Sequence, residues 1–306
     1  MSSASAAAPI AAAEDREVLD AQSLSFIVGA SAVGTIIEWY DFYLYAVLTP
    51  FLAPIFFPPG DSTSQLLSAF AVYGAGFAVR PFGAIVFGRV GDVIGRKYAF
   101  MVTVSLMGFA TFLVGVLPSY ETIGLFAPLI LVTFRMAQGL ALGGEYGGAA
   151  IYVAEHAPDH KRGLYTSWIQ TTATIGLFIA LGVIMTTRLY FGDAVYKDWG
   201  WRVPFLISIF LVAFALWIRV RLQETPVFRR MKAAGQTAKN TASWAKDSFG
   251  GSRVGVILLV LFGMTAGQAV VWYQGQFQAL NFFTVYRSEE HTSELQSRQY
   301  LVCRLL

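Results

Sequence analysis

Apolar residues fall in long blocks along this chain, and short polar segments separate one block from the next. Most blocks are close to the length of about 20 residues that a helix needs to cross the hydrocarbon core of a bilayer. The short alternating segments of an outer-membrane barrel are missing, so the pattern predicts an all-α polytopic membrane protein. The seven blocks cover approximately residues 24–48, 66–87, 98–117, 122–146, 164–187, 203–220 and 254–280.

Prolines predict where the helix of the first block ends. Proline removes a backbone donor and restricts the conformation of the residue before it. Because Pro50, Pro54, Pro58 and Pro59 follow the block directly, we expect this helix to stop near Thr49.

The composition supports a membrane protein. Charged residues make up 13% of the 306 residues and hydrophobic residues 56%, whereas soluble domains carry roughly 25% charge. The chain has one cysteine, Cys303, and its three histidines lie outside the apolar blocks. We therefore expect no disulfide framework, no metal site, no cofactor and no nucleophile–base arrangement of an enzyme. The partners expected are the lipid bilayer, protons and a small molecule, and not nucleic acid.

Changes in composition divide the chain into five segments. Residues 1–22 are rich in Ala and Ser and carry four acids and one base, which predicts a disordered cytoplasmic tail. Residues 23–222 are expected to form a six-helix transmembrane bundle, 223–253 a cytoplasmic linker and 254–286 the seventh helix. Residues 287–306 change abruptly in character and are predicted to be a non-native tail, with a genuine polar tail as the alternative.

The distribution of basic residues predicts the orientation. If the N-terminus is inside, the inside segments hold fourteen Lys and Arg residues and the outside segments three. Basic residues concentrate on the cytoplasmic side of membrane proteins. The sequence therefore predicts a multi-pass protein of the bacterial inner (plasma) membrane with a cytoplasmic N-terminus.

Ionisable residues inside the apolar blocks need a partner or a function, because lipid does not solvate them. In the first block Gly34, Glu38, Asp41 and Tyr45 share one helical face, which must look into the bundle. At about 1.5 Å per residue, Glu38 and Arg135 both fall near the bilayer midplane. We expect these two to pair, with Asp41 a little further out.

The fourth block places further polar residues on one side of its helix. Gln138 and Glu145 share that side with Arg135, and the glycines around them, Gly139, Gly143 and Gly144 among them, allow neighbouring helices to approach closely. Glu145 and Arg80 lie nearer the inner surface, so we expect a second charged cluster there.

Two interpretations of these charges stay open. They are either ion pairs that hold helices in register or a site that couples protons to transport, in which Glu38 or Asp41 exchanges a proton and Arg135 binds an anionic group or releases the acid. Other candidates for a small polar ligand are Gln170, Trp272, Tyr273 and Gln276. Near a helix end such aromatics are equally often interface anchors.

A basic turn joins the second and third blocks and reads Gly88-x-x-x-Asp92-x-x-Gly95-Arg96-Lys97. Gly88 and Gly91 let the turn pack closely, and Asp92 can pair with Arg96 or cap the third helix. The turn resembles the loop 2–3 signature of the major facilitator superfamily, with Val93 where a basic residue is usual.

Four further stretches resemble the metabolite:proton symporter branch of that superfamily. They are Glu38-Trp39-Tyr40-Asp41-Phe42, Arg80-Pro81-x-Gly83, Arg135-x-x-Gln138-Gly139 with Gly143-Gly144-Glu145, and Pro158-x-x-x-Arg162-Gly163. The resemblance implies a twelve-helix fold in two halves, of which this chain would hold the first six helices and helix 7 and so be truncated. It also implies proton-coupled symport of a small organic acid or zwitterion. Asp92, Arg96 and Lys97 would then act in gating, by a latch onto the second half.

Other functions compete with this interpretation. An uncoupled facilitator or an antiporter on the same fold would use the acids for structure alone. A membrane receptor or assembly subunit needs no midplane charges, and a membrane enzyme needs a reactive constellation that the blocks lack. The sequence therefore favours a secondary transporter.

Overall fold

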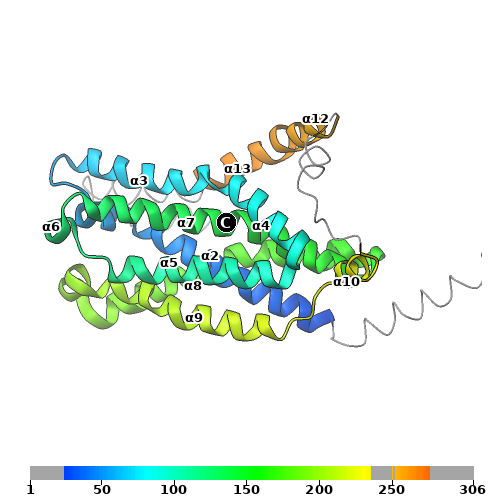
Figure 1. The fold of residues 1–306 in the computed structure, drawn as a ribbon. Helices are drawn as coiled ribbons and strands as arrows, with labels where there is room; N and C mark the ends of the chain where they lie inside the picture. Colours follow the sequence, from blue (N-terminus) through cyan, green and yellow to red (C-terminus); the bar gives the residue numbers. More distant parts are fainter. Residues whose placement is uncertain (1–23, 236–249, 251, 276–306) are drawn as a thin grey trace, which may run out of the picture. The chain divides into compact units, whose positions relative to one another are not determined.

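The computed structural model describes residues 24–235, 250 and 252–275. The chain forms two compact units, the first ending at Lys239 and the second beginning at Asn240, and each is described by itself. Every regular element in the described part of the chain is a helix (Figure 1). This confirms the all-α prediction for these residues.

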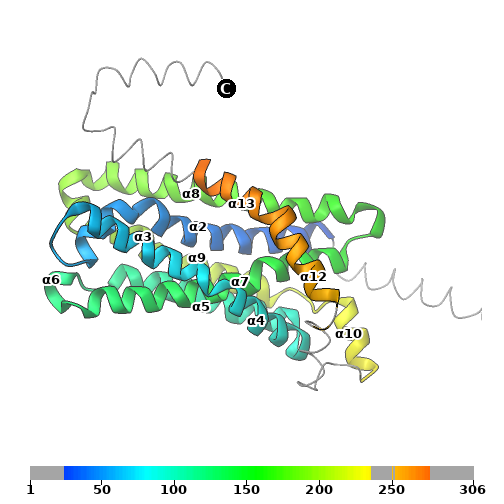
Figure 2. The ribbon, with the colours of Figure 1, turned by 90° about the horizontal axis from the view of Figure 1, so that it is seen from above.

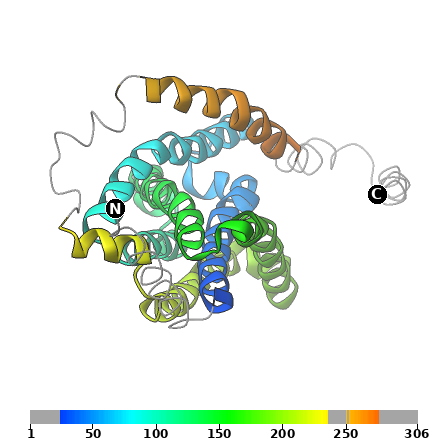
Figure 3. The same cartoon turned by 90° about the vertical axis from the view of Figure 1, so that its right-hand side faces the viewer.

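The first unit is a bundle of long helices that run alongside one another (Figures 1 and 2). α2 contacts α3, α5, α7, α8 and α9, and Figure 3 views this arrangement along the helices. The elements are α2 (Leu24–Phe56), α3 (Ser62–Ala78), α4 (Arg80–Ile94), α5 (Arg96–Val116), α6 (Tyr120–Ile123), α7 (Phe126–His156), η1 (Asp159–Lys161), α8 (Arg162–Val195), η2 (Tyr196–Gly200), α9 (Arg202–Val220) and α10 (Pro226–Ala233).

Five stretches of the described residues are long and apolar enough to cross a membrane. They are Ser62–Ile94, which joins α3 and α4, Arg96–Val116, Phe126–His156, Asp159–Gly200 and Arg202–Val220. α2 has the length, at 33 residues, but its acids, tyrosines and hydroxyls lower its hydropathy. α2 can contain these polar side chains because it packs against several other helices, which shield them from lipid.

The predicted end of the first helix near Thr49 is wrong. α2 continues through Pro50 and Pro54 and ends at Phe56. The fixed φ of proline is itself helical, but each proline removes one backbone hydrogen bond from α2 and its ring crowds the carbonyl four residues earlier. Leu52 and Phe56 are fully buried, and their packing offsets that loss.

The helices of the fourth and fifth blocks are also longer than their apolar blocks. α7 continues past residue 146 to His156, and α8 continues past residue 187 to Val195. An apolar block records the thickness of the hydrocarbon core, whereas a helix can extend into the aqueous interface on either side. Block lengths therefore underestimate helix lengths in this bundle.

Glycines set the spacing between α3, α4 and α7. A Cβ on Gly139 would overlap the carbonyl oxygen of Gly76, and a Cβ on Gly83 would overlap that of Leu140. The backbones of these helices therefore touch, as the predicted role of small residues requires.

One end of the first unit gathers the turn after α4, the end of α9, and α10 (Figure 1). The Lys97 ammonium donates to the carbonyl of Val220 at 2.6 Å, which ties the turn to α9. Many of the basic residues counted as inside lie here, and we call this part of the molecule the basic end.

The second unit contains α12 (Ser252–Leu258), the π-helix η3 (Leu259–Thr265) and α13 (Ala266–Tyr273). These elements follow one another directly, where the sequence predicts the seventh helix. Trp272 and Tyr273 belong to α13, but their side chains and Gln276 lie outside the described residues, as do the tails 1–22 and 287–306. The predicted role of these three residues stays a prediction.

Candidate functional site

α2 points both of its carboxyl groups into the bundle. Glu38 is 2% exposed and Asp41 is 1% exposed. Tyr45 on the same face is buried as well. The predicted inward direction of this face is confirmed, and each carboxyl group finds its own set of partners.

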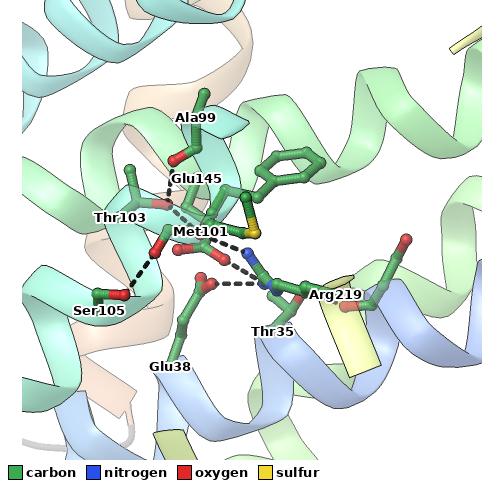
Figure 4. Close-up of polar contacts among 10 residues, drawn as sticks. Thr35, Glu38, Ala99, Met101, Thr103, Ser105, Glu145 and Arg219 are labelled. Atoms are coloured by element: carbon green, nitrogen blue, oxygen red, sulfur yellow. Dashed lines mark hydrogen bonds and ion pairs between the residues drawn. The ribbon is translucent and has the colours of Figure 1, made fainter. Parts of the chain in front are cut away.

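Glu38 belongs to a buried ion-pair triad, shown in Figure 4. The guanidinium of Arg219 from α9 lies 3.2 Å from Glu38 Oε1 and also pairs with Glu145 from α7. The other terminal nitrogen of Arg219 donates to the carbonyl of Phe100 in α5 at 3.1 Å. We call Glu38, Glu145 and Arg219 the triad; it joins α2, α7 and α9.

The triad corrects two predicted pairs. Glu38 does not pair with Arg135, and Glu145 does not cluster with Arg80, because both acids meet Arg219. Depth along a helix could be counted from the sequence, but which helices face each other could not. Arg219, at the end of the sixth apolar block, was counted among the basic residues of the inside segments, whereas its side chain is buried within the bundle.

Gly34 was the available clue to this arrangement. It lies one turn before Glu38 on the inward face, and a Cβ there would overlap the Arg219 guanidinium. The glycine thus leaves the space that the arginine fills.

Asp41 lies in a second buried cluster. Ser208 of α9 donates to Asp41 Oδ1 at 2.6 Å, and Arg135 is close enough for its charge to act on Asp41. Arg135 donates to Gln138, and Gln138 in turn donates to Thr111 of α5 at 2.8 Å. The arginine expected for Glu38 is therefore held near Asp41.

Aromatic rings surround the two arginines on this side of the bundle. The Arg135 guanidinium carbon is 4.4 Å from the ring centre of Tyr45 and 5.3 Å from that of Tyr73. The Arg80 guanidinium carbon lies 4.0 Å from the ring centre of Phe77. Cation–π contacts of this kind stabilise a guanidinium where water is scarce.

Gln170 of α8 lies apart from the two charged clusters in a more exposed position. Its side-chain oxygen accepts a hydrogen bond from the hydroxyl of Tyr146. The ring of Tyr146 meets Trp39 edge-on at 6.1 Å, and Trp39 stacks on Tyr43. An amide beside aromatic faces is suited to a small polar ligand.

The basic turn is held by two acids that sequence reasoning missed. Glu224 accepts from the backbone N–H groups of Arg96, at 3.0 Å, and Lys97, at 3.3 Å. It therefore caps α5, which was one of the two roles expected for Asp92. Arg96 pairs with Glu155 at 3.4 Å and with Asp92 at 3.7 Å, so the predicted Asp92–Arg96 pair is confirmed.

Gly95 leaves the space that the Glu224 carboxylate needs to cap α5, whereas Gly88 does not contact a neighbouring helix closely. Gly95 has φ of 123°, and a Cβ there would overlap the Glu224 carboxylate. Nothing lies within 4 Å of a Cβ on Gly88, so the predicted close packing at that glycine is wrong. Gly88 and Gly147 instead line a cavity of about 200 Å³ between α4, α5 and α7.

No group of His, Cys, Asp and Glu in the described part of the chain is arranged to hold a metal ion. The two clusters consist of buried carboxyl, guanidinium, hydroxyl and amide groups between helices of the bundle. Such groups bind small ions and polar molecules and exchange protons.

Comparison with known proteins identifies this kind of bundle. Residues 27–254 match the family described as "Sugar (and other) transporter". The chain belongs to this transporter family of the major facilitator superfamily. A solved structure of the major facilitator superfamily proton:xylose symporter XylE, bound to 6-bromo-6-deoxy-D-glucose, shares its fold with a TM-score of 0.66 at 17% identity, over 91% of this chain and 66% of that chain.

Several family members from Escherichia coli (strain K12) are similar in sequence. The inner membrane metabolite transport protein YhjE is 43% identical over 226 residues, covering 74% of this chain and 51% of that protein. The alpha-ketoglutarate permease is 43% identical, covering 68% of this chain and 49% of the permease. A proline/betaine transporter is 39% identical, covering 71% and 43%. This family member spans about half the length of the curated relatives it matches.

Proposed function

We propose that the transporter containing this chain carries a small organic acid or zwitterion together with protons across the bacterial inner membrane. The relatives named for alpha-ketoglutarate, shikimate, proline and betaine support the substrate class, because each of these compounds carries a carboxylate. The gathering of basic residues at the basic end supports a cytoplasmic position for that end and for the N-terminus.

One observation carries the proposal: α2 buries two carboxyl groups beside arginines that come from other helices. Burying ions is costly, and replacing a buried ion pair by apolar residues is often neutral or stabilising. A contribution to the stability of the fold is therefore a weak explanation for the presence of these two buried charged clusters. Helices that move against each other during transport would change the partners of these acids, and with them the bound protons.

The second cluster is the proposed place for the anionic group of the substrate. Arg135 is held in position by its hydrogen bond to Gln138. The guanidinium groups of Arg80 and Arg135 both lie over the ring of Phe42. A substrate carboxylate can compete with Asp41 for the Arg135 guanidinium. Gln170, with Tyr146, offers hydrogen bonds to the rest of a small polar molecule.

Uptake into lipid vesicles tests this function. The transporter, expressed from its complete genomic locus, is reconstituted with a pH-sensitive dye inside the vesicles and offered proline, betaine, shikimate and alpha-ketoglutarate. We expect uptake of one of them to be driven by an imposed proton gradient and accompanied by protons. Glu38→Gln and Asp41→Asn should lower gradient-driven uptake at least tenfold, while the control Glu121→Gln, at an exposed acid of α6, should retain accumulation.

Two outcomes would contradict the proposal. Uptake that ignores the proton gradient points to the alternative, an uncoupled facilitator. Substrate entry with protons moving in the opposite direction points to an antiporter on the same fold.

A further inference from the structure

We propose that Glu38 and Glu145 share one bound proton beside Arg219, so that the triad is a proton-binding site separate from the cluster around Asp41. The proposal deepens the proposed function, and only its consequence for transport rests on that function. The binding of the proton itself is a property of the bundle and can be measured without transport.

The charges of the triad do not balance. Two carboxyl groups face one guanidinium, and all three side chains are at most 3% exposed. The charged groups that act on Glu38 among the described residues are Glu145 and Arg219. If both acids were ionised, an extra negative charge would be buried with no cation to offset it. A single proton removes this excess.

The helices packed around the triad add no second cation from the described residues. α2 contributes Glu38, α7 contributes Glu145 and α9 contributes Arg219. α5 contributes the backbone carbonyl of Phe100, which accepts a hydrogen bond from one nitrogen of the Arg219 guanidinium. That carbonyl brings no positive charge, so Arg219 is the one cation that these contacts give the two acids.

Two carboxyl oxygens of the triad have no hydrogen-bond donor beside them. Glu38 Oε2 and Glu145 Oε2 are buried and have no hydrogen-bond partner among the described residues. The two carboxyl groups contact the same nitrogen of the Arg219 guanidinium, which places them beside each other. A proton on one of them therefore supplies the missing donor to the other, the arrangement found where two carboxyl groups share a site.

Asp41 Oδ2 is also buried without a hydrogen-bond partner among the described residues, so the cluster around Asp41 differs from the triad in its charges and not in this respect. Asp41 has one arginine, Arg135, near it and accepts a hydrogen bond from Ser208. One acid and one base balance without a proton. Although Glu38 and Asp41 are about one turn apart on α2, the structure assigns the proton to the first.

Infrared spectroscopy of the chain in lipid vesicles tests the assignment, because the C=O stretch of a protonated carboxyl group is separate from the carboxylate bands. At neutral pH we expect a protonated-acid band of one group per chain, which shifts when glutamate is labelled with ¹³C and stays in place when aspartate is labelled. Labelling needs no substitution, so the result does not depend on whether a variant folds.

Substitutions then locate the proton. Glu38→Gln and Glu145→Gln should each abolish the band, because the remaining acid pairs with Arg219 as a carboxylate. The matched controls Asp41→Asn and Glu155→Gln should retain it. A band that is absent from the unchanged chain, shifts with labelled aspartate, or survives both glutamate substitutions would overturn the proposal.

The result is independent of the uptake assay. A glutamate band together with uptake that ignores the proton gradient supports the shared proton and contradicts only its role in transport. Coupled uptake without a glutamate band contradicts the shared proton and leaves symport in place.

Discussion

Replacing Gly139 by alanine tests the contact that brings α7, and with it Arg135 and Glu145, up to the rest of the bundle. A Cβ at this position would fall well inside the 3.0 Å that real Cβ atoms keep from the carbonyl oxygen of Gly76. The obstacle is backbone, so a rotamer change cannot relieve it, and α3 and α7 must separate. On the same helix Gly147 has nothing within 4 Å of an added Cβ.

The magnitude follows from two opposing effects. Forcing an extra carbon into a packed interface costs about 1–3 kcal/mol. Alanine in place of glycine within a helix returns about 1 kcal/mol. Gly139→Ala should therefore lower the free energy of unfolding by up to about 2 kcal/mol. Gly147→Ala has no steric cost and should raise it by up to about 1 kcal/mol.

The assay is equilibrium unfolding of the whole chain in mixed micelles, with helicity followed as denaturing detergent is added. The two variants should move the midpoint in opposite directions from the unchanged chain. If Gly139→Ala is as stable as Gly147→Ala, the backbones of α3 and α7 do not touch, and the placement of the α7 side chains in both clusters loses its support.

The same unfolding assay checks two further contacts. Glu224→Ala removes the acceptor of two N–H groups at the start of α5 and should lower the free energy of unfolding by about 1–2 kcal/mol. Glu224→Gln keeps one acceptor oxygen and should lower it less. Equal unfolding midpoints for Glu224→Ala and the unchanged chain would contradict the cap. Tyr40→Phe removes a buried hydroxyl that donates to the carbonyl of Pro204 at 2.8 Å and should cost about 1 kcal/mol. The exposed Tyr98 is the matched control, and a loss as large for Tyr98→Phe would show that the Tyr40 contact contributes nothing of its own.

Much of the fold could be predicted from the order of apolar and polar residues. The membrane class and the approximate position of each long apolar stretch of the first unit follow from it, because the cost of exposing a polar group to lipid arises at each residue separately. The ends of the helices are harder to predict from the sequence. α2 passes two prolines that the sequence marked as its end, since packing further along the helix offsets their cost.

The site was predictable in part. Glu38, Asp41 and Arg135 had to face inward on any arrangement of the helices, and the structure buries all three. Arg219 and Glu224 escaped notice because both stand where an apolar block gives way to a basic segment, and there a charged residue normally needs no explanation.

The sequence by itself determined which side chains must avoid lipid, because that requirement concerns one residue and its surroundings of hydrocarbon. Only the tertiary structure decided which charges meet. Pairing depends on how helices cross and on which faces they turn to each other, and those are set by contacts between residues far apart in the chain, such as Gly139 on Gly76 and Gly34 beside Arg219. Two acids about one turn apart on α2 therefore have different partners, one in a triad with an unbalanced charge and the other beside an arginine that balances it.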